Sequence, residues 1–225
     1  KFRLSEKTEI GMRSAFDQRD FAAQNFYTTL VSDTASEKVR SFWNHLQVKH
    51  QTRRGQLSLD LSNKNLNDQY LFNPRSVKNI SDSRLTQALL TWSRPLTNSL
   101  SMATGLHYQN KSISSNDRGE HAMNQLAPFI TLHQQFGNFF INPSIRFDWR
   151  ENIGTEVVPQ LNLAFKKNKW QFRGAIGKSI RDADFTERYN NYNKQLVTGG
   201  SIGNPALKAE RALSYEAGAD WFLHS

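Results

Sequence analysis

Three carboxylates near the end of the chain have the spacing that best fits catalytic chemistry. Asp182, Asp184 and Glu187 lie within one short segment, and glycoside hydrolysis needs a pair of carboxyl groups. The same segment carries a longer sequence pattern, described below, so we do not expect these groups to form an enzyme's active site. The sequence also contains no zinc-protease motif, no phosphate-binding loop and no nucleophile elbow.

Metal and phosphate sites are not indicated either. The chain has no cysteine, which excludes thiolate metal sites and disulfides. Its six histidines are scattered, and the spacing of His45 and His50 suits neither one strand face nor one helix turn. The glycine-rich run 199–203 is followed by Asn-Pro rather than by a helix, so it does not predict a phosphate cradle. We therefore expect no metal and no cofactor.

The charge balance is strongly basic. There are 29 Lys and Arg against 20 Asp and Glu, a net charge of +9. Aromatic residues make up 12% of the chain, which is too many for a disordered protein. Aromatic and charged residues mostly occupy opposite faces of the expected strands, whereas single-stranded nucleic acids need them interleaved. The basic excess instead favours contact with anionic lipid headgroups and an interior that attracts anionic ligands.

The dominant pattern is an alternation of apolar and polar residues with period two. In residues 139–150, Phe139, Ile141, Ile145, Phe147 and Trp149 share one face, and the other face carries Arg146, Asp148 and Arg150. Such alternation is typical of a half-buried strand. It recurs in segments beginning near Leu57, Leu100, Leu126, Leu161 and Leu213. Because no apolar run exceeds three residues, a transmembrane helix is not expected.

The connections between these segments alternate in length. Short polar turns at 52–55, 94–98, 136–138 and 166–169 alternate with longer polar stretches at 29–37, 71–83, 114–121 and 179–208. This order predicts about ten strands of roughly ten residues, with turns at one end and loops at the other, as in outer-membrane barrels. Aromatic residues near strand ends fit the interfacial girdles of such barrels: Trp92, Tyr108, Trp149, Trp170 and Trp221. Pro143 and Pro159 argue mildly against long regular strands, since each removes a ladder donor.

Three motifs follow one another in the last fifty residues. The first comprises Arg181, Phe185, Glu187 and Tyr189; the second comprises Asn204, Pro205, Leu207, Lys208 and Glu210; the third comprises Tyr215, Glu216 and Gly218. In this order and spacing they resemble the C-terminal barrel signature of TonB-dependent outer-membrane receptors. Ala183 and Ala209 stand where the family usually has proline, and Ala212 stands where serine is common.

The resemblance implies an all-β, antiparallel up-and-down transmembrane β-barrel of about 22 strands, with residues 1–225 as a partial barrel domain. The plug domain and the remaining strands would lie outside this segment. It further implies a receptor in the cell outer membrane, not an enzyme. The receptor would bind an extracellular small molecule, such as a ferric siderophore or cobalamin, and import it with energy from the TonB complex. The expected partners are this ligand, outer-membrane lipid and, through the plug, TonB; nucleic acid is not expected.

We expect the ligand to contact loop side chains and arginines that face the lumen: Arg181, Asp184, Glu187, Arg188, Tyr189 and Tyr192 from the loop, and Arg146, Arg150 and Arg173 from the strands. The motif residues Asn204, Pro205, Leu207, Lys208, Glu210, Tyr215, Glu216 and Gly218 should serve the fold. Among them, Glu216 is expected to pair with an arginine on a neighbouring strand and Tyr215 to face outward.

Two other classes of protein stay open at this point. A passive porin would share the strand pattern, but a plugged receptor should pass little steady ion current. A soluble all-β module that binds glycans would also alternate, but it would stay monodisperse without detergent.

Overall fold

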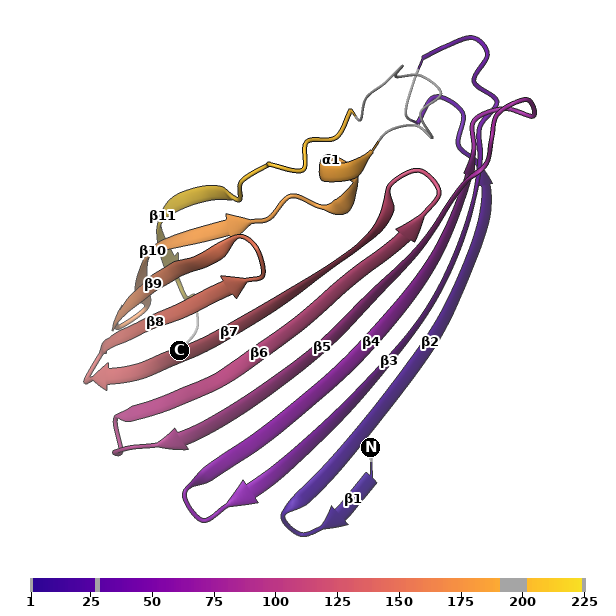
Figure 1. Cartoon of the computed structure of the whole chain (residues 1–225). Coiled ribbons are helices and arrows are strands. Elements are labelled where there is room, and N and C mark those ends of the chain that lie inside the picture. The colour runs from indigo at the N-terminus through magenta and orange to yellow at the C-terminus, as the bar shows by residue number, and fades with distance from the viewer. Residues whose placement is uncertain (1, 27–28, 191–201, 224–225) are drawn as a thin grey trace.

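A computed structural model describes residues 2–26, 29–190 and 202–223, and in this part of the chain eleven strands form one antiparallel sheet (Figure 1). Every strand pairs with its neighbours in sequence, so the topology is up-and-down. The strands are β1 (Phe2–Ser5), β2 (Thr8–Ala22), β3 (Ser36–Thr52), β4 (Gly55–Leu71), β5 (Asn79–Pro95), β6 (Leu100–Ser115), β7 (Gly119–Phe136), β8 (Phe139–Arg150), β9 (Gly154–Lys167), β10 (Trp170–Arg181) and β11 (Glu210–Trp221).

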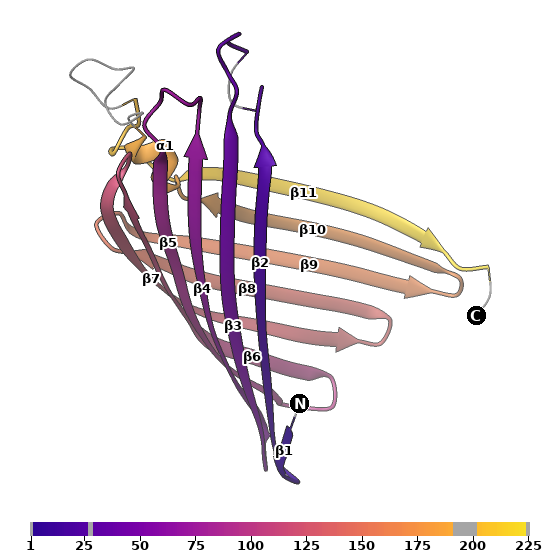
Figure 2. The same ribbon diagram turned by 90° about the vertical axis from the view of Figure 1, so that its right-hand side faces the viewer.

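The connections lie at two ends of the sheet. At the turn end, residues 6–7, 53–54, 96–99, 137–138 and 168–169 join the strands of each hairpin. At the loop end, the connections are residues 23–35, 72–78, 116–118, 151–153 and 182–209, and the last contains helix α1 (Phe185–Tyr189). The sheet is curled rather than flat, as Figure 2 shows by the crossing of β2–β5 in front of β8–β10. Among the described strands, β1 and β11 are the two edges.

The strands are longer than the alternation predicted. β7 has 18 residues, and β3, β4 and β5 have 17 each. The expected long loop at 114–121 was wrong, because β6 continues to Ser115 and β7 begins at Gly119. The reason is that the strands become polar on both faces near the loop end, which removes the alternation. Asn63, Asn65 and Asn67 of β4, for example, continue the face that carries Leu57 and Leu61.

The register gives the sheet two distinct faces. The apolar face carries Met12, Leu46, Leu61, Leu90, Leu106, Ile130, Phe147, Val157, Phe172 and Tyr215, and the polar face carries Arg13, Gln47, Asp60, Gln87, Gln109, Gln125, Asp148, Glu156 and Arg173. The apolar side chains are uncovered: Met12 is 70% exposed and Tyr215 69%. A continuous apolar surface of this kind needs an apolar surrounding or a partner. No described helix is long and apolar enough to cross a membrane.

Prolines interrupt the ladders without ending the strands. The pairing of β7 with β8 skips the positions around Pro128 and Pro143 and resumes beyond each. The pairing of β9 with β10 stops at Gln160 and Gly177, next to Pro159, because proline has no N–H to donate. Beyond this point Glu156 of β9 forms ion pairs with Lys178 of β10 and Arg211 of β11. An ionic contact thus replaces the missing backbone bonds.

Candidate functional site

The segment between β10 and β11 folds back at the loop end and begins with a short capped helix. Asp184 is the N-cap of α1, and its Oδ1 accepts a hydrogen bond of 2.8 Å from the backbone N–H of Glu187. The Glu187 side chain returns the bond by accepting from the Asp184 N–H at 2.8 Å. This capping box satisfies two N–H groups that the first helical turn would leave unpaired, so these two carboxylates are committed to the local structure.

A buried ion network ties this segment to the sheet. Nη1 of Arg150, the last residue of β8, lies 3.3 Å from Oδ1 of Asp182, and Arg188 Nη2 donates to the same oxygen at 2.9 Å. All three side chains are at most 9% exposed. Arg188 also donates to the carbonyl oxygens of Ala183 and Pro205. Arg188 therefore links the residues before α1 to those after it. The carboxylate of Asp182, shared by Arg188 and Arg150, links this segment to β8.

A second ion network is exposed. Arg181 donates to both oxygens of Glu187, at 3.1 and 2.8 Å, and to both oxygens of Glu210, at 2.9 Å each. These charge-assisted bonds, together with the N–H of Asp184, hold the pKa of the Glu187 carboxyl below its ordinary value. The network closes the base of the loop, since Arg181 ends β10 and Glu210 begins β11.

An aromatic contact completes the attachment of α1 to the polar face. The Tyr189 ring stacks on the His121 ring of β7, with 3.4 Å between centroids and 6° between planes. His121 Nε2 lies 2.7 Å from the carbonyl oxygen of Arg118. Since a carbonyl can only accept, Nε2 carries the proton in this arrangement. We call the set Arg150, Arg181, Asp182, Asp184, Glu187, Arg188 and Tyr189 the loop anchor.

The structure brings most of the predicted ligand residues together, but largely through contacts with one another. Arg146 lies on the polar face of β8, four residues before Arg150, pairs with Asp148 and stays 40% exposed. Arg173 lies on the same face, and the register aligns it with Ala164 of β9 and Phe140 of β8. This row is six residues further from the loop end than the row of Arg146. At about 3.3 Å per residue, this places it about 20 Å away along the sheet. Tyr192 lies outside the described residues.

Two lysines on the polar face were not predicted. The register aligns Trp43, Lys64, Leu85, Lys111 and Met123 in one row across β3 to β7, which we call the lysine row. Lys64 and Lys111 are two strands apart, hence about 10 Å, and neither forms a salt bridge with a described residue. Extending the alternation of Leu57, Leu59 and Leu61 would have placed Lys64 on this face.

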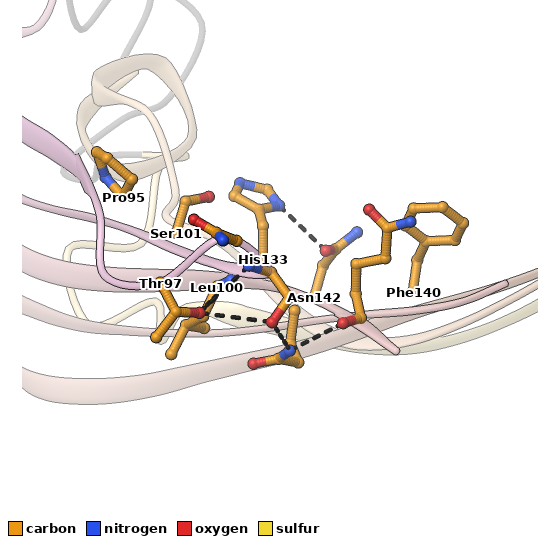
Figure 3. A pocket seen from close by; sticks show the side chains of 11 residues that line it. Pro95, Thr97, Leu100, Ser101, His133, Phe140 and Asn142 are labelled. Atoms are coloured by element: carbon orange, nitrogen blue, oxygen red, sulfur yellow. Dashed lines mark hydrogen bonds between the residues drawn. The ribbon is translucent and has the colours of Figure 1, made fainter. Parts of the chain in front are cut away.

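The turn end of the polar face carries a different kind of surface. A cavity of about 270 Å³ is lined by Pro95, Ser101, His133, Phe140 and Asn142 and by the turn 97–99 (Figure 3). His133 Nδ1 and Asn142 Oδ1 lie 3.1 Å apart, within hydrogen-bond distance. The lining has no Lys, Arg, Asp or Glu, so it offers no charge that would select an ionic ligand. Nor do the described residues form a group of three His, Asp or Glu that could hold a metal ion.

The eleven-stranded up-and-down sheet, with one apolar and one polar face, defines a segment of β-barrel wall. The chain belongs to the TonB-dependent receptor family: the family model "TonB dependent receptor-like, beta-barrel" matches residues 5–225. The fold class and the family inferred from the three motifs are thus confirmed. This is a family of transport receptors rather than enzymes. A comparison with curated proteins gave no match.

Solved structures of siderophore receptors share the fold. PirA from Pseudomonas aeruginosa superposes with a TM-score of 0.81 at 12% identity, over 99% of this chain and 42% of that one. A mutant of the ferric enterobactin receptor PfeA from the same organism, in complex with enterobactin, gives 0.80 at 13% identity, over 98% and 39%. FrpB, an iron transporter from Neisseria meningitidis, gives 0.77 at 10% identity, over 98% and 41%. The chain thus spans about two fifths of these structures.

The structure places three of the motif residues that were expected to serve the fold. Asn204 Oδ1 accepts from the Ala206 N–H at 2.9 Å, which is turn chemistry of the expected kind. Tyr215 lies on the apolar face, opposite Ile176. Glu216 faces the polar side as expected but lies opposite Ala175, and the described partner of the neighbouring Arg173 is Asp220, at 2.9 Å. In this register Asp220 therefore has the role expected of Glu216.

Proposed function

We propose that the protein is a receptor of the outer membrane that binds an extracellular anionic metal chelate and imports it with energy from the TonB complex. Membership of a transport-receptor family supports this proposal, as do structural relatives named as siderophore receptors. The exposed apolar face supports placement in a bilayer, because barrel strands present such a face to lipid. Ferric siderophore complexes are often anionic, which fits the net charge of +9 better than cobalamin does.

We infer a negatively charged ligand from the lysine row. Lys64 and Lys111 have no acidic partner among the described residues, whereas Arg150, Arg181 and Arg188 are neutralised within the loop anchor. Unpaired cations on the wall of a closed barrel attract an anion more effectively than paired ones, since the low-dielectric wall focuses their field. Trp43 adds an exposed ring next to Lys64 in the same row.

The residues predicted from the sequence keep a place in this proposal. Arg146 is a half-exposed arginine of the polar face, and with Tyr189 it would bound the ligand on the β8 side. Arg150, Arg181, Asp184, Glu187 and Arg188 would hold the loop in position, and Tyr192, outside the described residues, stays a predicted contact. Arg173 would meet the ligand later, about 20 Å further along the lumen.

Charge reversal in the full-length receptor tests the proposal. The double variant Lys64→Glu/Lys111→Glu should bind ferric enterobactin, an anionic chelate, at least tenfold more weakly, a change of about 1.4 kcal/mol. The matched control Lys167→Glu adds a negative charge near the turn end, on the apolar side of β9, and should bind normally. Unchanged affinity in the double variant, with both proteins folded, would remove the lysine row from the site.

A second measurement concerns energy coupling. Cells expressing the receptor should accumulate the labelled ferric chelate only while the inner membrane is energised, and a protonophore should abolish uptake but not surface binding. Uptake that continues after the protonophore, together with a large steady ion current in planar bilayers, would favour a passive porin instead.

A further inference from the structure

Positive charge gathers at the turn end of the sheet. The residues within three positions of the five turns include eight of the 29 Lys and Arg but only two of the 20 Asp and Glu. None of the eight forms a salt bridge with a described residue, so together they favour an anionic partner. We call these cations the basic rim: Arg3, Lys7, Arg53, Arg54, Arg94, Lys166, Lys167 and Lys169.

Two adjoining cavities lie beside this rim on the polar face. The cavity of about 270 Å³ described above (Figure 3) shares Pro95, Ser101 and His133 with a second cavity of about 390 Å³. The second cavity reaches Gln51 and Gln56 on the β3–β4 hairpin. We call the two cavities together the turn-end trough. It crosses the sheet from β4 to β8, which is four strand spacings or about 19 Å, so it suits an extended ligand better than a compact one.

The lining of the trough is polar and almost uncharged. Its side chains include six amides and four hydroxyls, and Arg94 is the one Lys, Arg, Asp or Glu among the described lining residues. Gln51 Nε2 donates to Gln56 Oε1 at 3.1 Å, and His133 Nδ1 lies 3.1 Å from Asn142 Oδ1. These contacts orient the amides but leave Gln56 Nε2 and Asn142 Nδ2 without a hydrogen-bond partner among the described residues. Such groups match the hydroxyl and acetamido groups of a sugar, which both donate and accept.

Cations border this neutral lining without being neutralised. The Arg94 guanidinium lies over the Trp92 ring, 5.3 Å from its centroid, and its Nε has no hydrogen-bond partner in the described part of the chain. On β8, the ring of Phe140 lines the trough, and Lys166 Nζ lies 5.3 Å from its centroid. The two arginines of turn 53–54 lie at the β4 end. Because an aromatic ring positions a cation without cancelling its charge, these groups stay available to carboxylates.

This combination of groups discriminates between classes of ligand. An anionic phospholipid would pair with the basic rim, but its acyl chains need the apolar face, whereas the amides lie on the polar face. A neutral sugar would bind the amides and leave the cations without a partner. An amino-sugar polymer that carries short peptides with free carboxylates supplies a partner for both kinds of group.

We propose that the turn-end trough binds the cell-wall glycan, an N-acetylated amino-sugar polymer whose short peptides carry free carboxylates. Gln56, His133 and Asn142 bind its hydroxyl and acetamido groups, and Lys166 and the arginines of turn 53–54 bind the carboxylates. This inference rests on the proposed function only in placing the turn end in the periplasm, where this polymer lies. It does not involve the imported chelate.

The test uses the full-length receptor in mild detergent and isothermal titration calorimetry. The probe is a disaccharide of N-acetylglucosamine and N-acetylmuramic acid that carries its tetrapeptide. Arg53→Gln/Arg54→Gln should bind the probe at least fivefold more weakly at low salt, with a smaller difference at high salt, because salt screens exposed charges. His133→Ala/Asn142→Ala should bind at least fivefold more weakly at both salt concentrations, since it removes uncharged contacts.

The matched control Arg40→Gln/Arg84→Gln removes two exposed arginines near the loop end, neither of which forms a salt bridge with a described residue, and should bind the probe normally. Uptake of the ferric chelate is measured in parallel. A receptor that imports the chelate but does not bind the probe would contradict this inference alone. A receptor that binds the probe but imports no chelate would contradict the proposed function alone.

Three further results would overturn the inference. Equal binding of the probe by the wild type and both trough variants would exclude the named side chains. Equal binding of the disaccharide without its peptide would exclude recognition of the carboxylates. Normal binding of the probe by Arg53→Gln/Arg54→Gln, together with weaker binding to phosphatidylglycerol vesicles, would assign the basic rim to lipid instead.

Discussion

Arg150, at the end of β8, and Asp182, immediately after β10, form a buried ion pair across the loop end of the sheet, with Nη1 and Oδ1 3.3 Å apart. Two connections separate these residues in sequence, so the pair fixes where the β10–β11 segment starts relative to β8. The Arg150 side chain is only 3% exposed, and its Nε and Nη2 have no partner among the described residues. The arginine therefore depends on this one carboxylate.

Removing the carboxylate should release the loop. We expect Asp182→Ala in the full receptor to cost about 3–5 kcal/mol, because it leaves Arg150 buried and unpaired and deprives Arg188 of its anionic partner. Thermal unfolding and the rate of protease cleavage within residues 182–209 measure the effect. Asp184→Ala is the matched control: it removes only the helix cap and should cost about 1 kcal/mol. Equal losses in the two variants would argue against the special role of the shared carboxylate.

The stack of Tyr189 on His121 predicts a smaller effect with a clear control. Tyr189→Ala should lower the stability of the loop by about 1 kcal/mol beyond the lost area, since aromatic pairs contribute 0.5–1.5 kcal/mol. Tyr189→Phe should be nearly neutral, because the contact with His121 is made by the ring. Hydrogen exchange of the α1 amides is the readout. A loss in Tyr189→Phe as large as in Tyr189→Ala would show that the hydroxyl, and not the stack, carries the contact.

The exposed network around Arg181 predicts a pH dependence. The pKa of Glu187 is lowered from its ordinary 4.5, mainly by the hydrogen bonds from Arg181. A carboxyl with a depressed pKa in the folded state contributes stability that is complete above its ordinary pKa and is lost as the pH falls through the folded-state value. Protection of the loop from exchange should therefore be constant near neutral pH and fall below about pH 4.5. In Glu187→Gln this part of the dependence should disappear, and its persistence would point to another acid.

Residue alternation predicted the two faces well, because burial on one face imposes period two wherever that face meets an apolar medium. It placed Arg146, Asp148 and Arg150 together on the polar face, and the register confirms this. It failed at the loop end, where both faces of a strand are polar. There Asn63, Asn65 and Asn67 occupy the face that is apolar elsewhere in β4, so the alternation no longer distinguishes strand from loop.

The partners of the predicted site residues could not be read from the sequence. The Asp184–Glu187 spacing is a capping signal, so the start of α1 could have been predicted from the sequence. That Asp182 would meet Arg150, or that Lys64 and Lys111 would share a row, depends on strand register across several hairpins. Register is a property of the assembled sheet, since a shift of two residues preserves every face but changes every partner.

Gly105 illustrates a constraint that only the assembled sheet reveals, and it carries the last prediction. A Cβ placed on this residue of β6 would lie 2.7 Å from the Phe129 ring of β7, its cross-strand partner, and 2.2 Å from the Leu90 carbonyl oxygen. Gly105→Ala should therefore cost about 1–3 kcal/mol through strain. The double variant Gly105→Ala/Phe129→Ala should relieve the strain between the added Cβ and the ring. The strain against the Leu90 carbonyl oxygen should remain. Thermal unfolding of the full receptor measures both, and a neutral single variant would contradict the close packing at this point.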